Sequence, residues 1–237
     1  MLFLAFGLIS LVLFYQNYFF RMKRNEAEQL LKVSLDSEKN ERHRIAADLH
    51  DSVAGDLSAI KNYLSLLQRS NVAVKDEPMF AEIKIGVENA LENTRLISYK
   101  LMPPLLESFG LVAAVKDHME RLTAKTTVTF SIDADETLVV STSISYELFR
   151  VIQEFTTNMM KYGNISTCTI TMRNVDGIFQ IDIKDDGIPF DFFKSVKVSK
   201  GLGLQNISSR LKVIGAELSQ MEQTKGNHFT ITRKAND

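Results

Sequence analysis

Residues 41–57 read ERHRIAADLHDSVAGDL, and their apolar side chains begin a regular pattern. Apolar residues recur there at steps of four and three, which places them in one stripe along a helix. The stripe consists of Ile45, Leu49, Val53, Leu57, Ile60, Leu64 and Leu67. Beside it lies His50, which Asp51 follows directly. The stretch therefore predicts an amphipathic helix that carries an imidazole next to a carboxylate.

The pair formed by His50 and Asp51 has two interpretations. An imidazole beside a carboxylate can act as a nucleophile next to its proton acceptor. A histidine with an ordinary structural role on a helix flank fits the same two residues, because geometry decides whether such a pair reacts. The choice between them depends on motifs further along the chain.

The composition is that of an ordinary globular protein. The chain has 237 residues, 45% of them hydrophobic and 24% charged, which is enough for one or two domains. Its formal net charge of -1 does not indicate direct nucleic-acid binding. The single cysteine, Cys168, cannot form an intrachain disulfide and belongs to no zinc motif. We expect Cys168 to be a small strand residue.

Residues 1–20 are almost wholly apolar, and basic residues follow at Arg21, Lys23 and Arg24. A helix of this length spans about 30 Å, the thickness of a bilayer's hydrocarbon core. A cleaved signal peptide fits less well, because no basic stretch precedes the run and no small-residue cleavage site follows it. By the positive-inside rule, we expect a single-pass transmembrane helix in the inner (cytoplasmic) membrane. The remainder would be cytoplasmic, with no extracellular sensing segment.

Residues 21–37 suggest a helical signalling linker, although a merely solvated helix fits the weak heptad pattern as well. After the helix that carries His50, a second helix is expected. Its coiled-coil seam consists of Phe80, Ile83, Val87, Ala90, Thr94, Ile97 and Leu101. Pro103 and Pro104 end this helix. Two such helices form an antiparallel hairpin, and two hairpins cover their seams as a four-helix bundle. We therefore expect residues 38–103 to form a homodimer.

The pattern changes after a junction at residues 104–125. Strands are expected at 128–132, 138–140, 167–173, 178–184, 217–222 and 228–233, and helices at 111–122, 144–162 and 204–214. Asp176 and Gly177 are typical of a hairpin turn. The fold class is thus α plus α/β. Residues 126–237 would form an α/β sandwich, one mixed sheet covered by helices on one face.

Three polar motifs of this second domain have the chemistry to hold a nucleotide. Glu154, Asn158 and Lys161 share one helix face and suit a hydrated magnesium ion and phosphates. Asp185 can accept a hydrogen bond from an amine such as that of adenine, and Gly187 lets backbone approach the ring. Each motif alone also fits an ordinary solvated face or turn.

The third motif is Gly201-Leu202-Gly203-Leu204, which opens a helix. Two glycines before a helix N-terminus form a phosphate cradle of backbone N–H groups, although a flexible loop has the same composition.

Together these motifs resemble the nucleotide-binding domain of the GHKL superfamily of ATPases and kinases. Residues 153–161 resemble its N box, residues 185–187 its G1 box and residues 201–204 its G2 box. Upstream, residues 44–51, RIAADLHD, resemble the phosphoacceptor box of two-component sensor histidine kinases. The similar subfamily includes the nitrate/nitrite sensors and the desaturase thermosensor, and the resemblance covers residues 38–235.

The resemblance implies a membrane-anchored, homodimeric sensor histidine kinase. His50 would be the phosphorylated nucleophile, and Asp51 would accept its proton. The phosphoryl group would come from ATP and pass to an aspartate on the receiver domain of a response regulator. Mg²⁺ would be held by Asn158 and, as a weaker expectation, by Glu154. The residues implied to bind ATP are Asn158, Lys161, Asp185, Gly187, Gly201, Leu202, Gly203 and Leu204, with residues 191–200 as the lid.

Three positions depart from the family's pattern. Tyr162 stands where many members have a histidine, and Pro189 fixes a φ angle where the family keeps a glycine. Gly55 stands where the subfamily usually has a glutamine that supports phosphatase activity. The first two departures support an alternative, a catalytically weak pseudokinase that binds ATP and scaffolds partners. A serine kinase of the anti-sigma type is a further alternative, but it leaves the His50–Asp51 pair unexplained.

Overall fold

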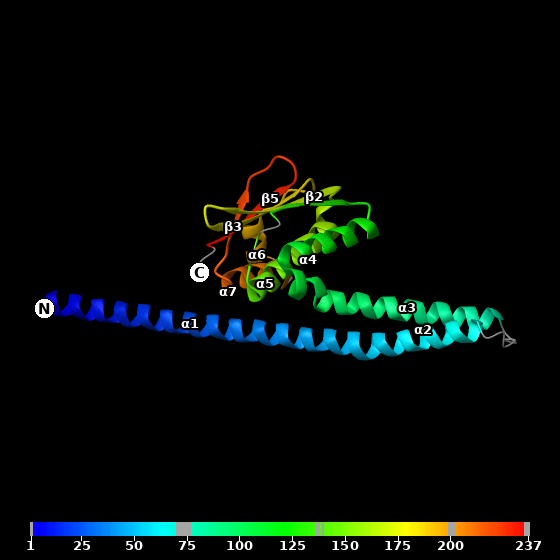
Figure 1. Cartoon of the computed structure of the whole chain (residues 1–237). Coiled ribbons are helices and arrows are strands. Elements are labelled where there is room, and N and C mark those ends of the chain that lie inside the picture. Colours follow the sequence, from blue (N-terminus) through cyan, green and yellow to red (C-terminus); the bar gives the residue numbers. More distant parts are fainter. Residues whose placement is uncertain (1, 70–76, 136–137, 139, 199–201, 235–237) are drawn as a thin grey trace.

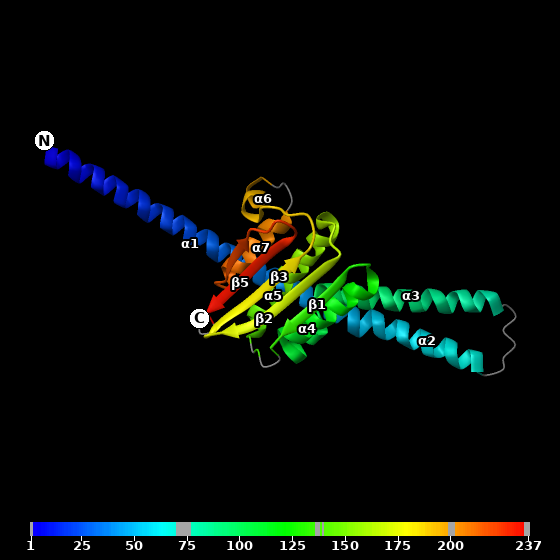
Figure 2. The same cartoon turned by 90° about the horizontal axis from the view of Figure 1, so that it is seen from above.

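The computed structural model describes residues 2–69, 77–135, 138, 140–198 and 202–234. It consists of a long helical part and a sheet part (Figure 1). The helical part contains α1 (Leu2–Asp48), a π-helical segment (Leu49–Val53), α2 (Ala54–Arg69) and α3 (Glu77–Leu101). Helices α2 and α3 lie side by side, as both views show (Figures 1 and 2), and they form the expected antiparallel hairpin.

The N-terminal helix α1 forms one rod with the π-helical segment and α2 (Figure 1). The large apolar side chains between residues 6 and 20 are exposed on this rod. Within the described ranges, no helix is both long and apolar enough to cross a membrane, so the transmembrane helix expected over residues 1–20 is not supported.

The described strands form one mixed sheet in the order β1-β2-β3-β5-β4. Their bounds are β1 (Thr129–Ala134), β2 (Thr167–Val175), β3 (Ile178–Asp185), β4 (Glu217–Met221) and β5 (Asn227–Lys234). Strand β1 is parallel to β2, and the other neighbours are antiparallel. As expected, Asp176 and Gly177 form the turn between β2 and β3, with φ angles of 52° and 76°.

The strand expected at 138–140 does not form at the two residues that the structure describes, Leu138 and Val140. The Leu138 N–H donates to the Asp135 carbonyl at 3.2 Å, which curls the chain locally. Both side chains pack against the core from this connecting segment. Their apolar alternation therefore reflects anchoring of a loop and not sheet pairing.

Helices cover one face of the sheet (Figures 1 and 2). They are α4 (Pro104–Lys125), α5 (Thr142–Asn158), a second π-helical segment (Met159–Gly163), α6 (Phe192–Val198) and α7 (Leu202–Val213). Helix α4 is longer than expected and bends at Gly110, whose φ is 79°. A positive φ of this kind favours glycine.

The core lies between α5 and the sheet. The rings of Phe155 on α5 and Phe229 on β5 are buried with their centroids 4.8 Å apart. Cys168 is buried in β2, which confirms the expectation for this residue, and burial raises the pKa of its thiol to about 12. Apolar burial of this kind fixes α5 against the strands.

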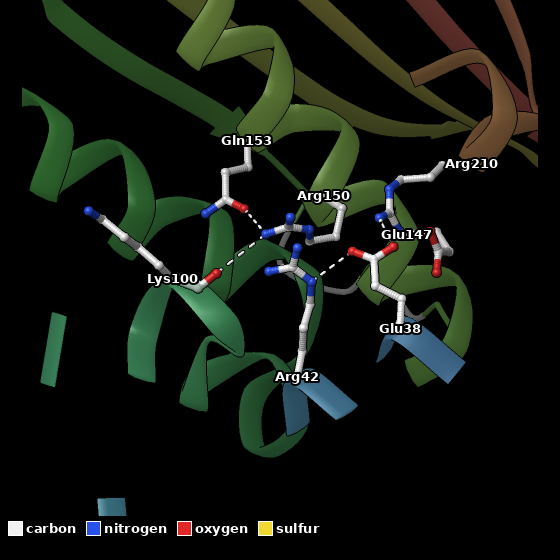
Figure 3. Close-up of polar contacts among 7 residues, drawn as sticks. All are labelled: Glu38, Arg42, Lys100, Glu147, Arg150, Gln153 and Arg210. Atoms are coloured by element: carbon white, nitrogen blue, oxygen red, sulfur yellow. Dashed lines mark hydrogen bonds and ion pairs between the residues drawn. The ribbon is translucent and has the colours of Figure 1, made fainter. Parts of the chain in front are cut away.

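An ion-pair network joins the sheet part to α1 (Figure 3). Arg210 of α7 bonds Glu147 of α5 at 2.7 Å and Glu38 of α1 at 2.8 Å. Glu38 also accepts from the Arg42 Nε at 2.7 Å. The side chains of Arg210 and Glu147 are only 6% and 5% exposed, so the buried Glu147 carboxylate needs Arg210 as its counter-ion. This network was not predicted from the sequence.

Candidate functional site

His50 lies in the π-helical segment that links α1 to α2. Such segments are rare inside α-helices and are often found at functional positions. The His50 Nδ1 lies 3.0 Å from the Asp51 Oδ1, and the two side chains are 71% and 80% exposed. When Nδ1 carries the proton and donates it to Asp51, Nε2 keeps a free lone pair. The arrangement gives an accessible nucleophile beside a proton acceptor, whereas the π-helical geometry was not predicted.

A cavity of about 610 Å³ lies within the sheet part, near the C-terminal end of α5. Its walls come from α5 and the second π-helical segment, the turn after β3, α6, the start of α7 and the start of β5. Among its lining residues are Glu154, Asn158, Lys161, Gly203 and Leu204. The structure therefore brings together side chains from two of the three motifs singled out in the sequence.

The α5 wall of this cavity carries an amide and a carboxylate. Asn158 donates through Nδ2 to the Glu154 Oε1 at 3.2 Å. Gly203 of α7 packs against this pair so closely that a Cβ there would collide with the Glu154 carboxylate. A glycine at this position therefore allows the first turn of α7 to approach α5.

Asp185 lies at the end of β3, half-buried, and does not itself line the cavity. Its Oδ1 accepts from the Gly187 N–H at 2.8 Å. Its two oxygens also lie 3.1 and 3.2 Å from the Asn227 Nδ2. Burial raises the pKa of the Asp185 carboxyl, and these donors oppose the rise. Asn227 does line the cavity, so it stands between that space and Asp185.

The neighbouring carboxylate of Asp186 has a different environment. Its Oδ1 accepts from the backbone N–H groups of Ser166 and Thr167 at 2.8 and 2.9 Å. These two donors hold the pKa of Asp186 below its usual range. Asp186 therefore fastens the end of β3 to the start of β2.

Gly187 occupies a position where no side chain fits. A Cβ there would collide with the Gly163 carbonyl oxygen, which accepts from the Ile188 N–H at 2.7 Å. On the other side, the Gly226 N–H donates to the Gly187 carbonyl at 3.0 Å. The turn after β3 is thus held between the second π-helical segment and the turn before β5.

Asn227 is the residue of this site that the sequence analysis missed. Besides Asp185, its side chain accepts from the Phe190 N–H at 3.0 Å and donates to the Ile188 carbonyl at 3.1 Å. The β3–β5 register places Asn227 opposite Asp185. That long-range pairing has no local sequence signal, because a Gly-Asn pair before a strand is read only as a turn.

Other expected residues are placed as follows. Gly201 lies outside the described residues, and Leu202 begins α7. Tyr162 lines the cavity and is 75% exposed. Part of the expected lid at 191–200 is α6, whose Phe192 is buried, while its last two residues lie outside the described ranges.

The cavity and His50 are separate in this arrangement. None of the described residues that line the cavity belongs to α1, α2 or α3. In the part of the chain that the structure describes, no group of three or more His, Cys, Asp or Glu side chains is placed to hold a metal ion.

Comparison with known proteins identifies the family of the helical part. Residues 41–106 match the family HisKA_3, described as histidine kinase. The chain is 27% identical over 215 residues to the sensor histidine kinase ComP of Bacillus subtilis (strain 168), covering 84% of this chain and 27% of ComP. It is also 27% identical over 196 residues to the sensor histidine kinase MctS of Rhizobium johnstonii, covering 81% of this chain and 42% of MctS. The chain therefore spans less than half the length of each of these relatives.

A solved histidine kinase structure has a fold similar to that of this chain. The histidine kinase domain of the blue-light activated histidine kinase from Erythrobacter litoralis EL346 is similar with a TM-score of 0.50 and 15% identity. The match covers 84% of this chain and 94% of that one. Residues 41–106 thus match a histidine kinase family, and the chain as a whole is similar to two-component sensor histidine kinases.

Proposed function

We propose that this chain is an ATP-dependent protein-histidine kinase that phosphorylates His50 and passes the phosphoryl group to an aspartate of a response regulator. The observation that carries the proposal is the exposed His50–Asp51 pair within the matched segment. A nucleotide-sized cavity in the sheet part supports it. The division into segments 1–20, 21–37, 38–103, 104–125 and 126–237 is part of the same proposal.

The residues of the cavity fit ATP with magnesium. The oxygens of Asn158 and Glu154 are ligands that Mg²⁺ prefers, and the ammonium of Lys161 suits the phosphates. Backbone N–H groups at the start of α7 would face the phosphates, because Gly203 lets this turn come close. A bound magnesium ion would neutralise charge on the phosphates.

The adenine contact proposed for Asp185 involves Asn227 as well. Asn227 lines the cavity, and its Nδ2 donates to both oxygens of Asp185. The adenine amine can therefore bind the carboxylate only if both donors bind it together or if Asn227 moves aside. A carboxylate only accepts hydrogen bonds, so the half-buried Asp185 is suited to selecting an amine, which donates, over a carbonyl, which accepts.

The proposed transfer step is a displacement at phosphorus. The His50 Nε2 attacks the γ-phosphorus, and the bond from phosphorus to the bridging oxygen breaks as ADP leaves with the electron pair. The imidazole ring then carries a positive charge, and its Nδ1 proton passes to Asp51, 3.0 Å away. Because His50 does not line the cavity, the step needs either movement of the sheet part or the His50 of a second chain.

The dimer is also a proposal, and the hairpin surface supports it. Large apolar side chains on α2 and α3 are exposed in the single chain. They include Ile60, Tyr63, Leu66, Leu67, Ile83, Ile85 and Ile97. An apolar surface of this kind marks an interaction site, and a second copy of the hairpin would cover it as a four-helix bundle.

A catalytically weak pseudokinase remains the second candidate, because Tyr162 lies at the cavity and Pro189 follows the turn after β3. Such a protein would bind ATP without phosphorylating His50. A serine kinase would instead form an acid-stable phosphate ester.

The first prediction tests phosphorylation of His50. The full chain incubated with labelled ATP and magnesium should gain an acid-labile, base-stable phosphate, and His50→Gln should abolish it because glutamine is no nucleophile. His43→Gln is the matched control, since His43 is also an exposed histidine of the same rod and pairs with Glu107 at 3.1 Å. Label that persists in His50→Gln would refute the assignment.

The second prediction separates the two neighbouring aspartates. Asp185→Asn should lower ATP affinity at least about tenfold, because the new amide group would face the donor Nδ2 of Asn227. Asp186→Asn removes the same charge but keeps an oxygen for Ser166 and Thr167, so its ATP affinity should stay near that of the wild type. Equal affinities for all three proteins in calorimetric titration would disprove the role of Asp185.

The third prediction concerns assembly. Ile83→Glu should shift the protein from dimer to monomer in sedimentation velocity, because it places an unpaired carboxylate in the proposed seam at a cost of several kcal/mol. Val175→Glu should leave the dimer intact, since Val175 is a similarly exposed residue at the end of β2. A wild-type protein that is monomeric at micromolar concentration would count against the bundle.

The fourth prediction concerns localisation. We propose that the exposed apolar residues between positions 6 and 20 contact a membrane, because so many exposed aromatic and aliphatic side chains favour lipid over water. The full chain should sediment with membranes and resist a high-salt wash, whereas a chain lacking residues 2–20 should stay in the supernatant. Recovery of the full chain in the supernatant would exclude this contact.

A further inference from the structure

A second cavity, of about 440 Å³, lies at the junction between the helical part and the sheet part. Its lining residues come from α1, α3, α4, α5 and the second π-helical segment. Five of them carry a permanent positive charge, namely Arg42, Lys100, Arg121, Lys125 and Arg150. Among the described lining residues, Glu154 alone is a carboxylate. The cavity wall therefore has a strong excess of positive charge.

Arg150 is the cation at the centre of this junction. Its Nη1 donates to the Lys100 carbonyl oxygen at 3.3 Å and to the side-chain oxygen of Gln153, and both acceptors are neutral (Figure 3). Its Nε is buried and has no partner in the described part of the chain. No described carboxylate forms an ion pair with Arg150, so a largely buried guanidinium has no direct counter-ion.

A second guanidinium, that of Arg42 on α1, lies close to Arg150, as Figure 3 shows. Burial first, and then the charge of Arg42, lower the pKa of Arg150. Glu38, a carboxylate whose charge acts on Arg150, is already bound to Arg42 and Arg210 at 2.7 and 2.8 Å. Two like charges from different parts of the molecule therefore meet at the junction, which disfavours the contact unless an anion lies between or beside them.

The other lining groups do not supply that anion. Arg121 is neutralised by Asp117 at 3.0 Å and stacks on the ring of Tyr99. Burial lowers the pKa of His118 to about 4, so its ring is neutral near pH 7 and neither adds nor removes charge. Lys100 and Lys125 are exposed and form no ion pair within the described ranges.

We propose that this junction cavity binds a small phosphorylated anion that bridges the cations of α1 and α3 to Arg150 of α5. Guanidinium groups match phosphate oxygens with two parallel hydrogen bonds, which is why phosphate is favoured over a single halide ion. The cavity is concave and has apolar sides at Leu96, Leu122 and Met160, so it suits a small molecule and not an extended surface.

Binding at this position has a conformational consequence. The anion would contact both parts of the molecule at once, so it stabilises the arrangement in which they touch. Glu154 lines this cavity and also the larger one in the sheet part. One turn of α5 therefore forms part of the wall of both cavities. The proposal is independent of whether the chain phosphorylates His50.

The test uses inorganic pyrophosphate as the probe and the full chain without magnesium or nucleotide. Calorimetric titration at matched ionic strength should detect binding to the wild type. Arg150→Gln and the double variant Lys100→Gln/Lys125→Gln should each weaken it by at least about tenfold, because each loses charge-assisted hydrogen bonds. The double variant changes only exposed side chains, so it gives an answer even where Arg150→Gln fails to fold.

Two controls identify the cavity that is occupied. Arg24→Gln removes a cation from α1 far from the junction, where Arg24 pairs with Glu28 at 2.9 Å, and it should leave pyrophosphate affinity unchanged. Lys161→Gln removes the cation of the larger cavity, and it should leave unchanged the part of the pyrophosphate binding that is lost in Arg150→Gln and in the double-lysine variant. No binding to the wild type, equal binding to the Arg150 and double-lysine variants, or loss of binding in Lys161→Gln alone would each overturn the proposal.

Discussion

The buried ion pair between Arg210 and Glu147 is the interaction on which the geometry of the sheet part depends. It joins α7 to α5, the two helices that form opposite walls of the larger cavity. Both side chains are almost fully buried, so loss of Arg210 would leave Glu147 as an uncompensated buried charge at a cost of about 3–5 kcal/mol. The same pairing keeps Gly203 within packing distance of Glu154.

The ion pairs that link α7 to α1 are more exposed to water than the pair between Arg210 and Glu147. Glu38 is 34% exposed, and the Lys212–Glu28 pair at 2.9 Å is more exposed still. Exposed pairs of this sort contribute roughly 0–1 kcal/mol each. The ion pairs between the sheet part and α1 are thus more accessible to water than the α5–α7 pair. If the proposed transfer to His50 occurs by movement of the sheet part, this difference allows the contact with α1 to release while the α5–α7 contact holds.

The sequence predicted those features that short-range periodicity encodes. Steps of three and four identified the hairpin helices, and Asp176-Gly177 identified the β2–β3 turn. Local pattern was insufficient where pairing at long range decides the structure. Leu138 and Val140 alternate like a strand but lie in a connecting segment that carries a local turn, and Asn227 acquires its role only from its register with Asp185. The two π-helical segments were also missed, because one inserted residue barely changes the apolar pattern.

The charged side chains are distributed unevenly, which the overall composition does not show. A net charge of -1 suggests an unremarkable surface, yet five cations and one carboxylate line the junction cavity. Two nearby acids, Glu38 and Asp117, do not line the cavity and are already bound to Arg42 and Arg121. Arg150 is thus left between neutral acceptors at the one place where α3 and α5 meet through a direct hydrogen bond. A contact with unbalanced charge is sensitive to small anions, and this sensitivity is a physical route by which the arrangement of the two parts responds to the surroundings.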